Sequence, residues 1–272
     1  MLIWCLVLGI WNFLLVRAVR EPPLHCLLPF LCLSTPLPIY LLYSSHVTCH
    51  ASRFMSETIL ITGASGLLGR ALVARFAQED FQVLAHCRLR PGKEADNVQW
   101  LAGDFSTAES TADFLIEHEK RLKECRYLIN NYGPITLRPT VDVTGKDLLA
   151  DFLQQVVPAV DISRFLIARA PLQFVLNIGF EYSGEIRAYQ KILGYAMAKN
   201  ALLLLTRSWA AAYPDVCFNL FSPPSLEKAE VLPKQAHIVA PELVAERIFR
   251  IMARRSSGFH YRYTDPPAAT KR

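Results

Sequence analysis

The chain has 272 residues, and 52% of them are apolar, which is enough to fill the core of one large domain. Its formal net charge of +5 is modest, and no run of Lys and Arg or basic–aromatic pattern indicates nucleic-acid binding. The seven cysteines include no CxxC pair, so they indicate buried free thiols rather than a disulfide framework or a metal site.

Residues 1–54 form an apolar leader with few charges. The uncharged run before Arg17 is slightly shorter than the ~20 residues that span a bilayer comfortably. If it inserts, Arg17 and Arg20 favour the cytoplasmic side for the remainder, and a membrane is then a partner. The alternative is a misplaced start, because Met55 leads directly into the first predicted strand. Under both interpretations, we expect residues 55–272 to form one cytoplasmic domain that contains the functional site.

The stretch from Thr58 to Gly69 predicts a nucleotide phosphate site. Residues 58–61 are β-rich and nearly all apolar, as in a strand buried on both faces of a parallel sheet. Glycines follow, and residues 68–78 have apolar side chains at helical spacing. Such glycines allow a tight turn and a close approach of the pyrophosphate, while the helix N-terminus offers free N–H groups. The alternative is an ordinary glycine turn.

The remaining elements alternate regularly. Further strands are predicted at residues 82–87, 98–102, 127–131, 172–178, 216–221 and 258–262. Further helices are predicted at residues 107–124, 146–165, 196–213 and 241–254. Strands that alternate with helices along the whole chain predict an α/β fold with a doubly wound parallel sheet, the Rossmann fold.

The end of the second predicted strand bears on the choice of cofactor. An NAD site usually places an Asp or Glu about 20 residues beyond the glycines, where it binds the ribose 2′-hydroxyl. Cys87 holds that place here, and Arg88 follows it. A guanidinium without a neighbouring acid suits a 2′-phosphate, so the sequence favours NADP(H) over NAD(H). The alternative is a solvated surface arginine.

Five short motifs occur in order along this framework. They are Thr62-Gly63-x-x-Gly66-x-x-Gly69, Asp104, Asn130-Asn131-Tyr132-Gly133, Tyr195-x-x-x-Lys199, and Asn219 with Pro223. This order resembles the short-chain dehydrogenase/reductase family over about residues 58–262. The spacing TGxxGxxG departs from the TGxxxGxG of the family's main branch and is nearer to its extended or atypical branches.

The resemblance implies an NAD(P)(H) cofactor and a small-molecule carbonyl or alcohol substrate. Asp104 is expected to meet the adenine amino group, and Asn130–Gly133 to support the central strand and line the cofactor. The cofactor-binding set implied by the resemblance is Gly63, Ser65, Gly66, Leu67, Leu68, Gly69, Arg88, Asp104, Asn131, Tyr132, Gly133, Tyr195, Lys199 and Pro223. Tyr132 stands where the family has a small residue.

Tyr195 and Lys199 are four residues apart, so a helix places both on one face. A phenol with a pKa near ~10 is a poor acid or base at neutral pH. A neighbouring ammonium, reinforced by oxidised nicotinamide, favours the phenolate and lowers its pKa. The resemblance makes Tyr195 the acid/base and Lys199 its activator; the alternative is a surface Tyr with a solvated Lys.

Several positions depart from the family pattern. Phe180 stands where a Ser normally hydrogen-bonds the substrate carbonyl, so Ser183 or Tyr182 is expected to supply that hydroxyl from a shifted loop. Gln155 and its successors replace a helix Asn that supports a proton relay. After the sixth strand, Pro223-Pro224 offers one N–H donor fewer than the usual Pro-Gly.

Two functions therefore remain open. The first is an NADPH-linked oxidoreductase in which Tyr195, Lys199 and Ser183 carry the chemistry. The second is a protein that binds the cofactor but has degraded catalysis, acting as a sensor or an interaction module. The apolar segment at residues 201–205 suits a homo-oligomer interface and core burial equally well.

Overall fold

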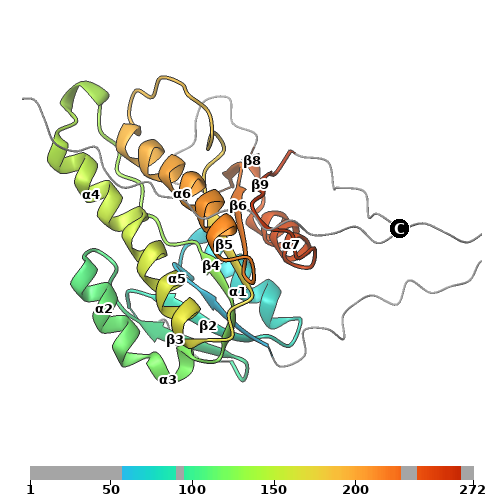
Figure 1. Cartoon of the computed structure of the whole chain (residues 1–272). Coiled ribbons are helices and arrows are strands. Elements are labelled where there is room, and N and C mark those ends of the chain that lie inside the picture. The colour runs from blue at the N-terminus through green and yellow to red at the C-terminus, as the bar shows by residue number, and fades with distance from the viewer. Residues whose placement is uncertain (1–56, 90–94, 228–237, 265–272) are drawn as a thin grey trace, which may run out of the picture. The chain divides into compact units, whose positions relative to one another are not determined.

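The computed structural model describes residues 57–89, 95–227 and 238–264, which belong to one compact unit (Figure 1). The leader, with its alternative interpretations, lies outside the described residues. Among the residues that are described, no helix has the length and apolarity to cross a membrane.

A seven-stranded parallel sheet forms the centre of the unit, with the strand order β3-β2-β1-β4-β5-β6-β9. Its strands are β1 (Thr58–Ile61), β2 (Gln82–Cys87), β3 (Val98–Ala102), β4 (Cys125–Asn130), β5 (Phe174–Ile178), β6 (Cys217–Ser222) and β9 (His260–Arg262). The order reverses between β1 and β4, and such a reversal is where open α/β sheets bind ligands. The predicted doubly wound sheet is confirmed.

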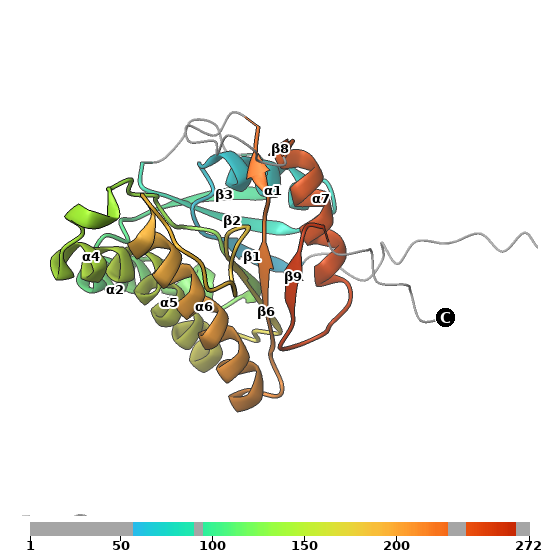
Figure 2. The same ribbon diagram turned by 90° about the horizontal axis from the view of Figure 1, so that it is seen from above.

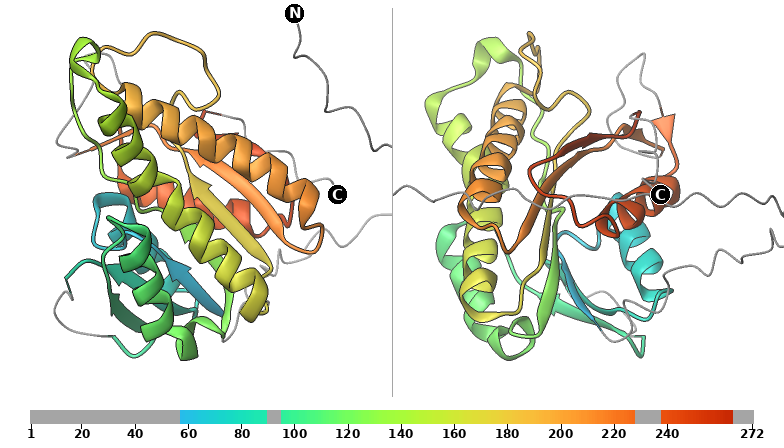
Figure 3. Two further views of the ribbon diagram at one scale, coloured as in Figure 1. Left: turned by 60° about the vertical axis from the view of Figure 1, so that its left-hand side comes forward. Right: turned by 45° about the vertical axis from the view of Figure 1, so that its right-hand side comes forward.

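Helices cover both faces of this sheet (Figures 2 and 3). One face carries α1 (Leu67–Ala77) and α7 (Pro241–Met252). The other carries α2 (Ala108–Glu117), α4 (Gly145–Gln155), α5 (Val157–Arg169) and α6 (Leu193–Ala212). Short elements complete the unit: α3 (Glu119–Leu122), a 3₁₀ turn at Thr140–Asp142, and the pair β7 (Ser225–Leu226) and β8 (Ile238–Val239).

The apolar pattern explains why these elements stack. Every residue of β1 is buried, with Ile59 and Ile61 on the side of α1 and α7 and Leu60 on the side of α2 and α5. Helix α7 starts at a proline and buries one stripe, including Val244, Ile248 and Ile251. A strand buried on both faces with amphipathic helices outside is the packing expected of a parallel sheet.

Two helices expected as single elements are divided. The helix predicted at 146–165 is α4 and α5, which meet at Val156, because Pro158 in the first turn of α5 has no N–H to continue α4. The helix predicted at 107–124 is α2 and α3, which meet at His118. The ring of His118 bonds the Ala102 carbonyl, 3.0 Å away.

Two further differences lie after β5. Helix α6 begins at Leu193 rather than at residue 196, so its first turn includes Tyr195. The two-residue strands β7 and β8 pair in parallel beside the main sheet and were not predicted, since two residues are too few to give a periodic pattern.

Candidate cofactor and active site

The turn after β1 is closed by contacts with the segment after β4. Gly63 has φ +62, and a Cβ on it would lie 2.9 Å from the Tyr132 Cα, so glycine is required there. A Cβ on Gly69 would overlap the Gly63 carbonyl. The Thr62 hydroxyl accepts the N–H groups of Asn131 and Tyr132, each 3.0 Å away.

This turn leaves the N-terminus of α1 open. Its N-cap, Gly66, makes no side-chain cap, and the first turn contains no acidic residue. Leu67, Leu68 and Gly69, which belong to the predicted cofactor-binding set, form that first turn and contribute backbone N–H groups. A helix N-terminus with unpaired N–H groups, preceded by a glycine turn that a ligand can approach closely, fits the diphosphate of a dinucleotide.

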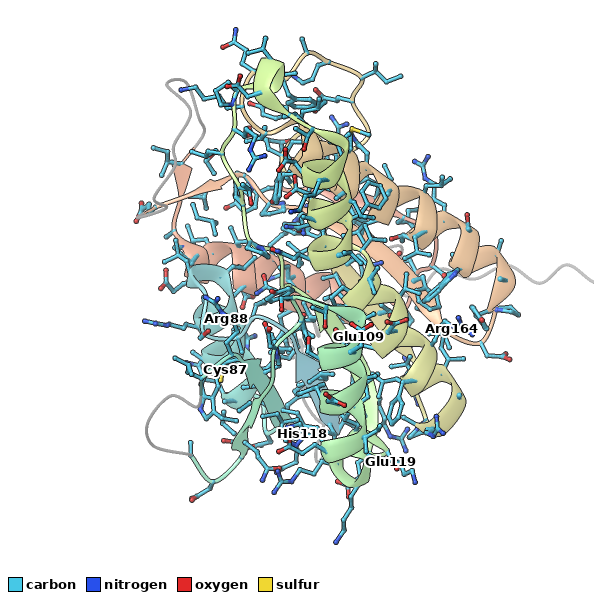
Figure 4. The ribbon with its side chains drawn as sticks, turned by 90° about the vertical axis from the view of Figure 1, so that its left-hand side faces the viewer. Cys87, Arg88, Glu109, His118, Glu119 and Arg164 are labelled. Carbon is cyan, nitrogen blue, oxygen red and sulfur yellow. The ribbon has the colours of Figure 1, made fainter. Side chains whose placement is uncertain are left out.

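The segments after β2, β3 and β4 bring the predicted adenosine residues together. The ring of Tyr132 packs edge-on against Phe105, with centroids 5.3 Å apart. Burial raises the pKa of the Tyr132 phenol; nearby Asp104 raises it further and nearby Arg88 opposes the rise. Arg88 is exposed beside Cys87 (Figure 4), and Asp104 accepts the N–H of Ser106 at 3.3 Å.

The asparagines after β4 have separate roles. Asn131 donates its amide to the Gly63 carbonyl at 3.1 Å and so closes the turn from the other side. Asn130 is buried and donates to Asn177 Oδ1 at 2.8 Å. Asn177 in turn donates to the Thr206 hydroxyl at 2.9 Å. This buried chain of bonds joins β4, β5 and α6.

Tyr195 and Lys199 lie on one face of α6, and both are buried. Lys199 Nζ donates to the Ile178 carbonyl at the end of β5 (2.9 Å) and lies 5.6 Å from the centroid of the Tyr195 ring. Burial lowers the pKa of Lys199 to about 7 and raises the pKa of Tyr195. The expected lowering of the Tyr195 pKa by Lys199 does not appear in this structure, because burial dominates.

Gly133 and Gln155 lie next to Lys199. A Cβ on Gly133 would lie 2.8 Å from Lys199 Nζ and would overlap Gln155 Oε1, so both polar atoms converge on this glycine. The buried Gln155 amide donates to the Pro134 carbonyl, and its Oε1 has no hydrogen-bond partner among the described residues. The sequence marks Gln155 only as a replacement for the family's Asn, because its proximity to Lys199 depends on where α4 ends.

The loop after β5 holds the predicted substrate hydroxyl. Ser183 is fully buried, and its oxygen accepts the N–H of Phe180 at 2.9 Å. The ring of Phe180 packs against Tyr195, with centroids 5.7 Å apart. Tyr182 is the other residue expected to supply the hydroxyl. Its ring also packs on Phe180, and the guanidinium of Arg187 lies over it.

A hollow of about 160 Å³ lies where the loop after β5 meets the ends of β6 and β9. It is lined by Glu181, Tyr182, Glu185, Ser222, Pro224, Arg262, Tyr263 and Thr264. Pro223, the last predicted cofactor residue, is partly buried between two of these lining residues.

His86 was not among the predicted site residues. This fully buried histidine of β2 accepts the N–H of Gly63 at Nδ1, 3.1 Å away, and its Nε2 bonds the Gly103 carbonyl at 3.1 Å. The signal available in the sequence was a histidine in an otherwise apolar strand one residue before Cys87, but its contact with the turn depends on the pairing of β1 with β2.

Sequence comparisons agree with this architecture. Residues 59–122 match the model of the NAD dependent epimerase/dehydratase family. The chain is 27% identical over 165 residues to the uncharacterized oxidoreductase YvrD of Bacillus subtilis, a match that covers 57% of this chain and 62% of that protein. A 36-residue stretch is 56% identical to the 3-oxoacyl-[acyl-carrier-protein] reductase FabG of Aggregatibacter actinomycetemcomitans, covering 13% of this chain and 15% of that one. The chain thus matches less than two thirds of the length of these relatives.

Solved structures share the fold at low identity. A short-chain dehydrogenase from Leptospira borgpetersenii with bound NAD+ superposes with a TM-score of 0.68 and 18% identity, covering 82% of this chain and 97% of that one. A 4-hydroxyisoleucine dehydrogenase complexed with NADH superposes with a TM-score of 0.67 and 18% identity, covering 76% of this chain and 96% of that one. These likenesses establish the Rossmann-like fold.

Proposed function

Because the chain belongs to the short-chain dehydrogenase/reductase family, we propose that it is an NAD(P)(H)-dependent oxidoreductase that reduces a carbonyl or oxidises an alcohol. One observation carries the proposal: Tyr195 and Lys199 are buried on one face of α6, and Lys199 Nζ lies beside Gly133, at the same end of the strands as the glycine turn. Burying an amine and a phenol costs stability, and titratable groups with such perturbed pKa values cluster at functional sites.

When bound, the cofactor supplies or accepts the hydride. The open N-terminus of α1 binds its diphosphate. Lys199, held by the Ile178 carbonyl, has two further protons to donate to ribose hydroxyls. Tyr195 gives its phenolic proton to the substrate oxygen during reduction and takes it back during oxidation. The ammonium of Lys199 stabilises the phenolate left behind.

The preference for NADP(H) over NAD(H) rests on Arg88. Its guanidinium is exposed after β2, near Tyr132, and Cys87 stands in the place of the acid that an NAD site uses. Two of the solved neighbours are complexes with NAD+ or NADH, so the proposed preference for NADP(H) is argued from Arg88 and Cys87 of this chain alone.

Arg88→Ala tests the cofactor preference directly. Loss of a charge-assisted contact to a phosphate is worth ~1.5–3 kcal/mol, so affinity for NADPH falls by roughly tenfold or more while affinity for NADH is unchanged. Fluorescence titration of both nucleotides with the wild type and the variant measures this ratio. A variant that keeps the wild-type preference for NADPH refutes the assignment.

The second candidate, a cofactor-binding sensor without catalysis, has one observation in its favour. Ser183 is fully buried, its oxygen accepts the Phe180 N–H, and the Phe180 ring packs against Tyr195, the proposed proton donor. Titration with NADPH followed by assay against aldehydes, ketones and diketones separates the two functions. Binding with turnover supports the oxidoreductase, and binding without turnover of any carbonyl supports the sensor.

A further inference from the structure

We infer that His86 is a positioning residue of the cofactor site: its neutral imidazole holds the glycine turn in the form that receives a dinucleotide diphosphate, and a second ring proton releases the turn. The inference rests on the proposed use of this turn for NAD(P)(H). It adds a residue that contacts no reacting atom and whose protonation state controls the affinity for the cofactor.

His86 holds two consecutive amides of the turn. The N–H of Gly63 donates to the ring Nδ1 at 3.1 Å, and the N–H of Ala64 donates to the His86 carbonyl at 2.8 Å. The N–H of Gly66 is also used within the turn, by the Gly63 carbonyl at 3.1 Å. The N–H groups of Gly63, Ala64 and Gly66 are therefore engaged by the protein, and the first turn of α1 keeps unpaired N–H groups for an anion.

The hydrogen bonds assign the tautomer of the ring. A backbone N–H can only donate, so Nδ1 of His86 must be the acceptor and carries no proton. Nε2 then carries the proton and donates to the Gly103 carbonyl at 3.1 Å. A second proton on the ring would face the Gly63 N–H with another N–H, so protonation and the bond to the turn exclude each other.

The surroundings of the ring favour the neutral form. His86 is fully buried and lies flat on Phe105, with centroids 3.7 Å apart and planes at 8°. Phe114 of α2 and Tyr132 after β4 contact its edges. Burial lowers the pKa of His86 to about 4; His118 of α2 lowers it further, while the Gly103 carbonyl and Asp104 oppose the change.

The chain contains a matched control. His118 is also buried, also packs edge-on against Phe114 (4.8 Å) and also bonds a carbonyl, that of Ala102. It lies at the other end of α2 from Glu109 (Figure 4), and among the described residues its ring bonds Ala102 and packs on Phe114 rather than on the glycine turn. His86→Phe and His118→Phe therefore remove the same polar groups from similar surroundings, but only the first removes the acceptor of the Gly63 N–H.

Two conservative variants separate the ring nitrogens. His86→Asn places an amide oxygen near the position of Nδ1, so it keeps an acceptor for Gly63 and has no titratable proton. His86→Gln reaches the position of Nε2 instead and keeps only the bond to Gly103. If the ring had only a structural role, these two variants would bind the cofactor with equal affinity.

The experiment is titration of the full chain with NADP+, which tolerates acid, at about pH 7.5 and then down to about pH 3.5, where a ring with a pKa of about 4 is mostly protonated. Near neutral pH we expect His86→Phe and His86→Gln to bind roughly tenfold more weakly than the wild type, the loss of about one well-placed hydrogen bond. His86→Asn should stay within about threefold, and His118→Phe should match the wild type. On acidification the ratio of wild-type to His86→Asn affinity should fall, while the ionisation of NADP+ cancels in that ratio.

Each outcome has a distinct meaning. A folded wild type that binds neither NADP+ nor NAD+ refutes the proposed function itself. Wild-type binding that His86→Phe leaves unchanged, or an affinity ratio to His86→Asn that stays constant with pH, overturns the role of His86 alone. If His86→Phe fails to fold, the comparison of His86→Asn with His86→Gln and the pH series still decide, since equal affinities of those two variants contradict the inference.

Discussion

Among the described residues, Lys199 is the one Lys, Arg, Asp or Glu that is buried. It is 2% exposed, its one hydrogen-bond partner among the described residues is the Ile178 carbonyl, and its pKa falls to about 7. In the unfolded chain the pKa of a lysine is ~10.4. Between these values the unfolded state binds the additional proton, so the free energy of unfolding rises with pH.

We therefore predict that Lys199→Met flattens the pH dependence of stability. For the wild type without ligand, the free energy of unfolding should rise from about pH 7 to about pH 9.5, and Lys199→Met should lose that rise because the variant has no proton to release. Urea unfolding at several pH values measures both slopes. Lys120→Met, at an exposed lysine, serves as the control and should keep the wild-type slope; equal slopes for wild type and Lys199→Met would contradict the burial argument.

At the scale of elements, α6 is tied to the sheet by the buried chain Asn130–Asn177–Thr206. Thr206 accepts from Asn177 and donates to the Leu202 carbonyl at 2.7 Å within its own helix. Because α6 carries both Tyr195 and Lys199, these bonds fix the pair relative to β4 and β5. A buried donor that loses its acceptor costs ~1–3 kcal/mol.

Thr206→Val should therefore lower the free energy of unfolding by ~1–3 kcal/mol, because the Asn177 amide is left without its acceptor. Thr111 provides a matched control. It is equally buried in a helix, and its hydroxyl also donates to a carbonyl four residues earlier, that of Thr107 at 2.9 Å, but it accepts from no side-chain amide of the residues that the structure describes. Urea denaturation should show a clearly smaller loss for Thr111→Val; equal losses would mean that the network adds nothing.

The elements also show what the sequence could predict. The strands were found because residues buried on both faces give uninterrupted apolar runs, and β2 and β3 match their predicted bounds. The helix divisions at Val156 and His118 were missed: the first depends on Pro158, and the second accompanies a bond to β3. Periodicity alone does not report such interruptions.

The sequence predicts site residues related by local spacing, but it does not predict contacts between residues far apart in the chain. The glycine turn and the pairing of Tyr195 with Lys199 follow from local spacing, and the structure brings Arg88, Asp104 and Tyr132 near one another. The contact of His86 with Gly63 and that of Gln155 with Gly133 join residues more than twenty positions apart. The bond from the Phe180 N–H to Ser183 turns a residue expected to meet substrate into part of a turn.

At the scale of the whole molecule, the segments to which a role in binding or catalysis is proposed all follow the carboxyl ends of the parallel strands. The glycine turn follows β1, the adenosine residues follow β2 to β4, the Phe180 loop follows β5, and the hollow near Ser222 follows β6. In a parallel sheet all these carboxyl ends lie together. The helices on the two faces of the sheet pack against it in two apolar cores, which hold these strand ends in place (Figure 3).

The most direct test of the account compares the full chain with its Tyr195→Phe variant, first in NADPH titration and then in turnover of a carbonyl series. We predict that both proteins bind NADPH with similar affinity and that the variant loses at least ~100-fold in kcat/KM, because only the phenolic proton is removed. Turnover that is indifferent to Tyr195 would contradict the proposed chemistry, and so would a wild type that binds NADPH but reduces no carbonyl.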